Sequence, residues 1–203
     1  SGKSFLVEGG RYRPLSIAMY ALEHELAGND PLFHHLMNVL WYILNCILVF
    51  YAVRILIRQK YSDQKNLIAA IVALWFTVHP LHVEAVANIK GRDEILALTG
   101  SLAVLIYFFR QINSYSILSA VLLFIFSLLA SLSKENAVFF IGTVPILGIL
   151  LNNISIGKAI KYGYPIFLGV GLYLGLRFWV LGSGADSAQM EFMYNPFLKY
   201  DSG

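Results

Sequence analysis

Ionisable residues are concentrated in the segment HPLHVEAVANIKGRDE, residues 79 to 94, which lies between two apolar runs. Read as a helix, this segment places Glu84, Asn88 and either Arg92 or Gly91 on one stripe, and His79, His82 and Val86 on a neighbouring stripe. A carboxylate can accept a proton in catalysis, and a guanidinium can bind an anion. The spacing therefore predicts polar groups that converge on one site.

Two later segments combine charge with apolar sequence. Lys134 and Glu135 lie in SLSKENA, at the end of one apolar run, and Arg177 lies in GLYLGLRFWVLG, about one turn from the end of another. A lysine at headgroup level can bind a lipid phosphate or extend to the interface. An unpaired buried guanidinium would cost several kcal/mol, so Arg177 is expected to have an anionic partner.

The first 40 residues add a further group of candidates. Arg13 precedes a proline in RYRPLS, while His35 and Asn38 are spaced i and i+3 in FHHLMN. This spacing predicts that His35 and Asn38 share one helix face. Packing is an equally good explanation for His34.

A metal site is an alternative explanation for part of the first segment. His79, His82 and Glu84 have the pattern HxxHxE, which offers nitrogen and oxygen ligands on nearby turns, but the spacing differs from the HExxH motif of zinc proteases. No metal is therefore assigned. Asp93 and Glu94 are also explained simply as anions at a helix N-terminus, where the helix dipole favours them.

The composition is that of a membrane protein. Of the 203 residues, 58% are hydrophobic and 13% are charged, and the mean hydropathy is +0.65. Soluble proteins are about half apolar and a quarter charged. Cys46 is the single cysteine and lies within an apolar run, which excludes a disulfide framework in this sequence.

The apolar runs predict an all-α fold: a polytopic membrane helical bundle with about six transmembrane helices, all in one domain covering residues 1–203. Several runs are shorter than the ~20 residues that cross a bilayer, and Pro80 is expected to kink or end the second. An external loop is expected at 1–32, and a further one begins at 182–203. The predicted spans are about 33–57, 66–87, 95–109, 116–132, 137–151 and 162–181.

Charge assigns the two sides of this bundle. If all six runs cross, one side holds the short loops 54–65, 110–115 and 152–161, in which Asp63 is the only acidic residue. The positive-inside rule makes that side internal and places residues 79–94 on the external side. The net charge of +3 follows from this distribution and does not indicate a nucleic-acid partner. The internal cations are Arg54, Arg58, Lys60, Lys65, Arg110, Lys158 and Lys161.

Several motifs occur in an order that resembles a known family. They are YRPLS, HLMN followed by Asn45, HPLHVEAVANIKGRDE, SLSKE and NPF, between Tyr12 and Pro196. This order resembles the transmembrane O-mannosyltransferases that target cadherins and their bacterial relatives with TPR tails. The resemblance implies a GT-C-like membrane enzyme, which moves a sugar, mannose in this family, from a polyprenyl or dolichyl phosphate carrier to a protein hydroxyl.

The resemblance also implies roles for the residues that match its motifs. Glu84, Arg92 and Glu135 are expected to be catalytic, and Arg92 is expected to bind the donor phosphate together with Lys134 and Arg177. The remaining candidates for substrate binding are His79, His82, Arg13, His35 and Asn38.

The family pattern is incomplete in this chain. The catalytic acid is expected early in the first external loop, upstream of Ser1, and Glu8, Glu23, Glu25 and Asp30 do not present its motif. Tyr42 stands where relatives often carry His. Later helices and TPR repeats are expected beyond Gly203. The chain is therefore expected to be a fragment that is inactive alone.

The expected partners are membrane lipid, a polyprenyl-phosphate sugar and an acceptor protein. The protein is expected in a bacterial inner membrane or in the endoplasmic reticulum membrane, with the lipid-linked donor in place of a cofactor. Three alternatives remain: a transporter, a structural membrane module and a metal-dependent membrane hydrolase. A transporter would use the same polar residues as a substrate path, but no inverted repeat is visible.

Overall fold

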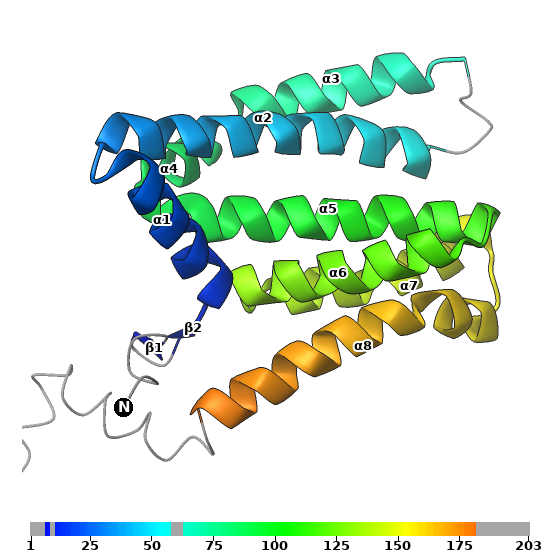
Figure 1. The fold of residues 1–203 in the computed structure, drawn as a ribbon. Helices are drawn as coiled ribbons and strands as arrows, with labels where there is room; N and C mark the ends of the chain where they lie inside the picture. Colours follow the sequence, from blue (N-terminus) through cyan, green and yellow to red (C-terminus); the bar gives the residue numbers. More distant parts are fainter. Residues whose placement is uncertain (1–6, 9–10, 58–62, 182–203) are drawn as a thin grey trace, which may run out of the picture.

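The computed structural model describes residues 7–8, 11–57 and 63–181, and it is a bundle of α-helices (Figure 1). The only strands in this part of the chain are β1 (Val7–Glu8) and β2 (Arg11–Tyr12), a short antiparallel pair. The predicted all-α membrane bundle is thus confirmed at the level of fold class. The helices are α1 (Pro14–Ala27), α2 (Pro31–Leu56), α3 (Lys65–Val78), α4 (His82–Ala87), the 3-10 helix η3 (Ile89–Gly91), α5 (Arg92–Asn113), α6 (Ile117–Ser133), α7 (Ala137–Asn152) and α8 (Ile156–Leu181).

Helix α5 is the centre of the bundle. It lies between the α2–α3 pair on one side and α6, α7 and α8 on the other (Figure 1). Most of its side chains are buried, including Val104, Phe108 and Phe109. A polar contact also joins it to α2, because Asn45 donates to the Ile95 carbonyl (2.9 Å) and accepts from Thr99 (2.8 Å).

Small residues allow the helices to cross closely, as the glycines in LALTGSLAVLIYFF and FLGVGLYLGL predict. A Cβ added to Gly100 of α5 would lie 2.7 Å from the Ala130 Cβ of α6. A Cβ added to Gly169 of α8 would lie 2.1 Å from the Ser127 Oγ on the same α6. Two glycines on different helices therefore set how closely α6 packs against α5 and α8.

The long helices alternate in direction, so the bundle has two ends (Figure 1). We call one the polar end; it comprises α1, α4, η3, residues 134–136 and the C-terminal end of α8. At the opposite end, called the basic end, α2, α5 and α7 finish and α3, α6 and α8 begin. The sequence assigns the loops between these helices to the internal side.

Three helical stretches are long and apolar enough to cross a membrane by length and composition: Pro31–Leu56, Ile89–Asn113 and Ile156–Leu181. Lys65–Val78, Ile117–Ser133 and Ala137–Asn152 are shorter apolar helices. Outward-facing apolar side chains are numerous on α2 and α8, for example Leu40, Ile47, Phe167 and Phe178. Such a surface is suited to lipid contact, and the protein is a membrane protein. Six crossings and a single domain stay predictions.

Several predicted boundaries are wrong. The second span was expected to continue to residue 87, but α3 ends at Val78 and α4 is a separate helix beyond Pro80. The segment 79–94 is therefore not one continuous helix, and its expected polar stripe does not form. The first external segment contains the helix α1, and α5 and α8 extend beyond the predicted spans, beginning at Arg92 and Ile156; the span bounds themselves stay predictions. Residues 182–203 lie outside the described part.

Candidate functional site

Arg92 is the most deeply buried charge at the polar end, with no exposed surface. Its guanidinium forms an ion pair with Glu23 of α1. It also donates to the Asn38 Oδ1 at 2.8 Å and to the His34 carbonyl at 2.7 Å, both on α2. The Tyr20 ring covers one face, 4.8 Å from the Arg92 Cζ. In this arrangement the guanidinium has no open face for a lipid phosphate, and the geometry supports a positioning role.

The Glu23 carboxylate completes this buried cluster. It is 3% exposed and lies 2.7 Å from the His34 Nδ1 as well as beside Arg92. Burial raises its pKa, but the hydrogen bonds from Arg92 and His34 and their charges outweigh that effect and hold the pKa below its usual value. Glu23 is therefore ionised at neutral pH and fixes α1 against α2 and α5.

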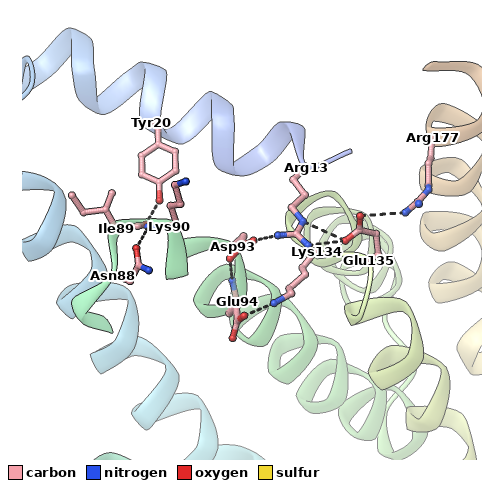
Figure 2. A network of polar contacts seen from close by, with 10 residues as sticks. All are labelled: Arg13, Tyr20, Asn88, Ile89, Lys90, Asp93, Glu94, Lys134, Glu135 and Arg177. Carbon is pink, nitrogen blue, oxygen red and sulfur yellow. Dashed lines mark hydrogen bonds and ion pairs between the residues drawn. The ribbon is translucent and has the colours of Figure 1, made fainter. Parts of the chain in front are cut away.

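Asn38 links the same cluster to the segment before α5. Its amide nitrogen donates to the Val86 carbonyl (3.3 Å) and to the Asn88 carbonyl (3.1 Å), where α4 ends and η3 begins. Tyr20 donates to the Ile89 carbonyl (Figure 2). A Cβ on Gly91 would lie 2.1 Å from the Ala85 carbonyl oxygen, so glycine is needed for this tight turn. Because of this turn, α5 begins with the Arg92 side chain buried in the interior of the bundle.

A second cluster lies closer to the surface at the polar end, and Figure 2 shows its members converging from four segments. Arg13, just before α1, forms an ion pair with Asp93 of α5. The same guanidinium contacts the Glu135 Oε2 at 3.2 Å. Arg177 of α8 approaches the Glu135 Oε1 at 3.4 Å and donates to the Tyr173 hydroxyl at 3.2 Å. Glu135 thus bridges two arginines that are 164 positions apart in the sequence.

Lys134 completes this surface cluster by pairing with Glu94 of α5 (Figure 2). We define the rim cluster by its six charged members. Three cations and three carboxylates balance one another, and their side chains are partly exposed, from 12% for Asp93 to 57% for Glu94. The rim cluster comprises Arg13, Asp93, Glu94, Lys134, Glu135 and Arg177.

The Glu135 pKa is lowered by its neighbours. Burial raises the pKa, but a backbone hydrogen bond and the positive charges of Arg13 and Arg177 lower it further than burial raises it. Glu135 is therefore a carboxylate at neutral pH. It can accept hydrogen bonds. If a ligand replaces Glu135 as the partner of Arg13 and Arg177, the carboxylate can also accept a proton.

The histidines of the HPLH motif lie at the end of α3. The His82 Nδ1 is 2.8 Å from the Phe76 carbonyl and 3.1 Å from the Tyr42 hydroxyl. Tyr42 also donates to the Phe76 and Thr77 carbonyls, at 3.0 and 3.1 Å. The His79 Nδ1 accepts from the Leu81 backbone at 3.3 Å. Both histidines therefore help to end α3.

The structure brings together only some of the predicted site residues. Arg13, Lys134, Glu135 and Arg177 meet in the rim cluster, whereas Arg92 and Asn38 lie in the buried cluster behind it. Glu84 and His35 are exposed, and among the described residues their side chains have no polar partner. The roles assigned to all of these residues stay predictions.

No group of three or more His, Cys, Asp or Glu side chains within residues 7–8, 11–57 and 63–181 could hold a metal ion. His79 and His82 are neighbours, with ring centroids 5.6 Å apart, but Glu84 does not join them. The proposed HxxHxE ligand set therefore does not form in the described structure.

The sequence reasoning missed several polar residues of the site. Glu23 and His34 belong to the buried cluster, whereas for His34 the sequence favours packing at least as much as function, and His35 is the candidate it selects. Asp93 and Glu94 begin α5 as predicted, but they also pair with Arg13 and Lys134. The signal that could have identified Glu23 is the need of a buried arginine for an anion.

Comparisons with known proteins find relatives that share one activity in their names. Protein O-mannosyl-transferase Tmtc3 of Drosophila melanogaster is 30% identical over 50% of the chain. A protein O-mannosyl-transferase of Caenorhabditis elegans is 35% identical over 66% of the chain, and TMTC1 of Homo sapiens is 35% identical over 42%. The matches cover 12%, 18% and 9% of those proteins, so they span less than a fifth of each.

These relatives confirm the resemblance to the transmembrane O-mannosyltransferase family, a family of glycosyltransferases. The resemblance to bacterial proteins with TPR tails stays a prediction. No family model matches the chain. No solved structure matches it with significance.

Proposed function

We propose that the chain, as a relative of protein O-mannosyl-transferases, forms the donor side of a GT-C-like membrane glycosyltransferase. This enzyme moves mannose from a polyprenyl or dolichyl phosphate to a hydroxyl of an acceptor protein, on the external or lumenal face. The observation that carries this proposal is the rim cluster, in which three cations from distant segments meet at one end of an apolar bundle. Cations at that level suit a lipid-linked phosphate.

In this proposal the donor phosphate exchanges with carboxylates of the rim cluster. The Glu94 partner of Lys134 is 57% exposed, and exposed ion pairs contribute only about 0–1 kcal/mol, so Lys134 can exchange Glu94 for a phosphate at small cost. The Arg177–Glu135 contact is the longest ion pair of the rim cluster, at 3.4 Å, and is proposed to exchange as well. Arg177 and Lys134 then neutralise the phosphate that leaves, while Arg13 remains held by Asp93.

When the donor phosphate replaces a carboxylate beside these cations, that carboxylate becomes free to act as a base in the transfer reaction. The acceptor hydroxyl oxygen attacks the sugar C1, the bond from C1 to the phosphate oxygen breaks, and its electron pair leaves with the polyprenyl phosphate. The hydroxyl proton passes to a carboxylate. Glu135 and the exposed Glu84 are the proposed acceptors in this chain, with a further acid expected upstream.

The other predicted site residues have supporting roles in this proposal. Arg92 and Asn38 position the rim by fixing the start of α5, rather than by touching the donor. His79, His82 and His35 line the approach of substrate on the same end. The protein acts as a multi-pass protein of a bacterial inner membrane or of the endoplasmic reticulum membrane. None of the relatives described above is named as a transporter.

The test is mannose transfer by the longest natural form of the protein, reconstituted with a polyprenyl-phosphate mannose. We expect Lys134→Gln and Arg177→Gln each to lower transfer by about 10² or more, because each removes a charge that stabilises the departing phosphate. Lys90→Gln is the matched control, since Lys90 is exposed at the same end and outside the rim cluster. Normal transfer by both rim variants would overturn the proposal.

A further inference from the structure

A groove of about 700 Å³ opens between α2, α5 and α6 towards the basic end. Its walls are mostly apolar, with Leu44 and Leu48 from α2, Ala103 and Ile106 from α5, and Phe126 from α6. It lies at the opposite end of the bundle from the rim cluster, so it does not depend on the proposed transfer reaction. A groove of this kind in a membrane bundle needs an apolar occupant.

Three cations line the groove at the basic end: Arg54 at the end of α2, Lys65 at the start of α3 and Arg110 near the end of α5. None of the three has an ion pair with an acid among the residues that the structure describes. Arg110 lies over the Tyr107 ring, with its Cζ 5.8 Å from the centroid. The charges of these three cations are therefore not balanced by ion pairs, in contrast to those of the rim cluster.

We propose that this groove binds an anionic phospholipid of the surrounding bilayer. The phosphate lies at Arg54, Lys65 and Arg110, and one acyl chain occupies the apolar part of the groove. The dimensions fit, because the lining of α5 runs from Thr99 to Arg110, about 16 Å at the rise of a helix. That is about half of the ~30 Å hydrocarbon thickness, the depth of one leaflet.

Charge favours this occupant over an uncharged lipid. A basic residue near an anionic membrane surface contributes about a fivefold preference, and three of them line one mouth. The positive-inside rule places this end in the leaflet where anionic lipids are concentrated. Arginine can donate two parallel hydrogen bonds to a phosphate, and lysine adds a compact positive charge.

The test uses photoreactive lipids in nanodiscs of phosphatidylcholine that contain the protein. One probe is phosphatidylglycerol with a diazirine in its acyl chain, and the matched probe is phosphatidylcholine with the same chain. We expect adducts of the anionic probe on residues 44–55 and 99–110, at a yield at least tenfold above that of the zwitterionic probe. Adducts confined to other helices, or equal yields, would overturn the proposal.

Variants separate the groove from general attraction to the basic end. A triple variant should lose the tenfold preference for the anionic probe; it carries Arg54→Gln, Lys65→Gln and Arg110→Gln. The control is the double variant Lys158→Gln and Lys161→Gln, which removes two exposed cations of α8 outside the groove. It should keep the preference for the anionic probe. Ala103→Leu, which narrows the groove, should lower the yield of both probes. If the first variant does not fold, the adduct map of the unaltered protein still decides.

Competitors identify the occupant. Unlabelled phosphatidylglycerol should displace the probe, whereas a soluble inorganic phosphate should not. Stronger displacement by polyprenyl phosphate than by phosphatidylglycerol would overturn the phospholipid assignment and make the groove a second carrier site. Absence of any adduct in the longest natural form of the protein would show that another segment fills the groove, which would also overturn the proposal.

Discussion

The side chain of Arg92 holds α1, α2 and α5 together through Glu23, Asn38 and the His34 carbonyl. Removing it would leave a carboxylate and an amide oxygen buried without their donor. We expect Arg92→Ala to lower the free energy of unfolding by about 3–5 kcal/mol, measured by denaturant unfolding in detergent micelles. Lys90→Ala, an exposed change two positions away, should stay within about 0.5 kcal/mol. An Arg92→Ala variant as stable as the parent would contradict the positioning role.

Glu23 makes the stability of the polar end depend on pH. Its pKa in the folded protein is below the ordinary value of 4.5, so the unfolded chain takes up its proton first as the pH falls. The stabilisation is complete well above pH 4.5 and is lost as the pH falls through the lower pKa of the folded protein. Melting temperatures measured from pH 7 downwards should decline below about pH 4.5. The decline should be smaller for Glu23→Gln and unchanged for the exposed Glu25→Gln.

Single residues of the site could be predicted where a charged side chain near an apolar run requires an oppositely charged partner. Arg177, near the end of an apolar run, required an anion, and the structure supplies Glu135. The pairing of His34 with Glu23 could not be predicted, because it depends on the rotational phase of α2, and packing against α1 sets that phase. Glu23 was considered only as a catalytic acid whose motif is absent, and its pairing with Arg92, 69 positions away, could not be derived from the sequence.

At the scale of helices, the crossing of α6 and α8 depends on Gly169. A methyl group there would lie 2.1 Å from the Ser127 Oγ and 2.8 Å from the Phe124 carbonyl oxygen. We expect Gly169→Ala to lower the free energy of unfolding by about 1–3 kcal/mol through overpacking. Gly171→Ala, on the same helix with open space around it, is the control and should be neutral or slightly stabilising. Equal effects of the two changes would argue against a close α6–α8 contact.

The helices themselves were largely predictable, because apolar runs of this length have few alternatives in a membrane protein. Each of the six predicted runs contains a helix. The segment 79–94 was the exception: Pro80 identified the break, but the direction of the chain after it could not be derived. That direction is set by contacts of Tyr42 with His82, of Asn38 with the Asn88 carbonyl and of Tyr20 with the Ile89 carbonyl, and the three side chains come from α1 and α2.

For the whole molecule, the division into two ends follows from alternating helices and an uneven distribution of charge. Acids and cations pair at the polar end, while the cations that line the groove at the basic end form no ion pair with an acid in the described structure. The cations without ion pairs therefore lie at the end that the positive-inside rule assigns to the internal side. The two proposed lipid sites would accordingly lie in opposite leaflets, one for a carrier phosphate and one for a bilayer phospholipid.

The alternation of the helices can be tested in a Cys46→Ala background with one new cysteine at a time. Lys90→Cys lies at the polar end and Lys158→Cys at the basic end, and both replace an exposed lysine. A thiol reagent that cannot cross membranes should label the first only from outside in intact cells or sealed vesicles, and the second only after permeabilisation. The physical reason is that translocating the basic loops is disfavoured, so they stay inside. Labelling of both from one side would contradict the alternating arrangement, and with it the separation of the rim cluster from the groove.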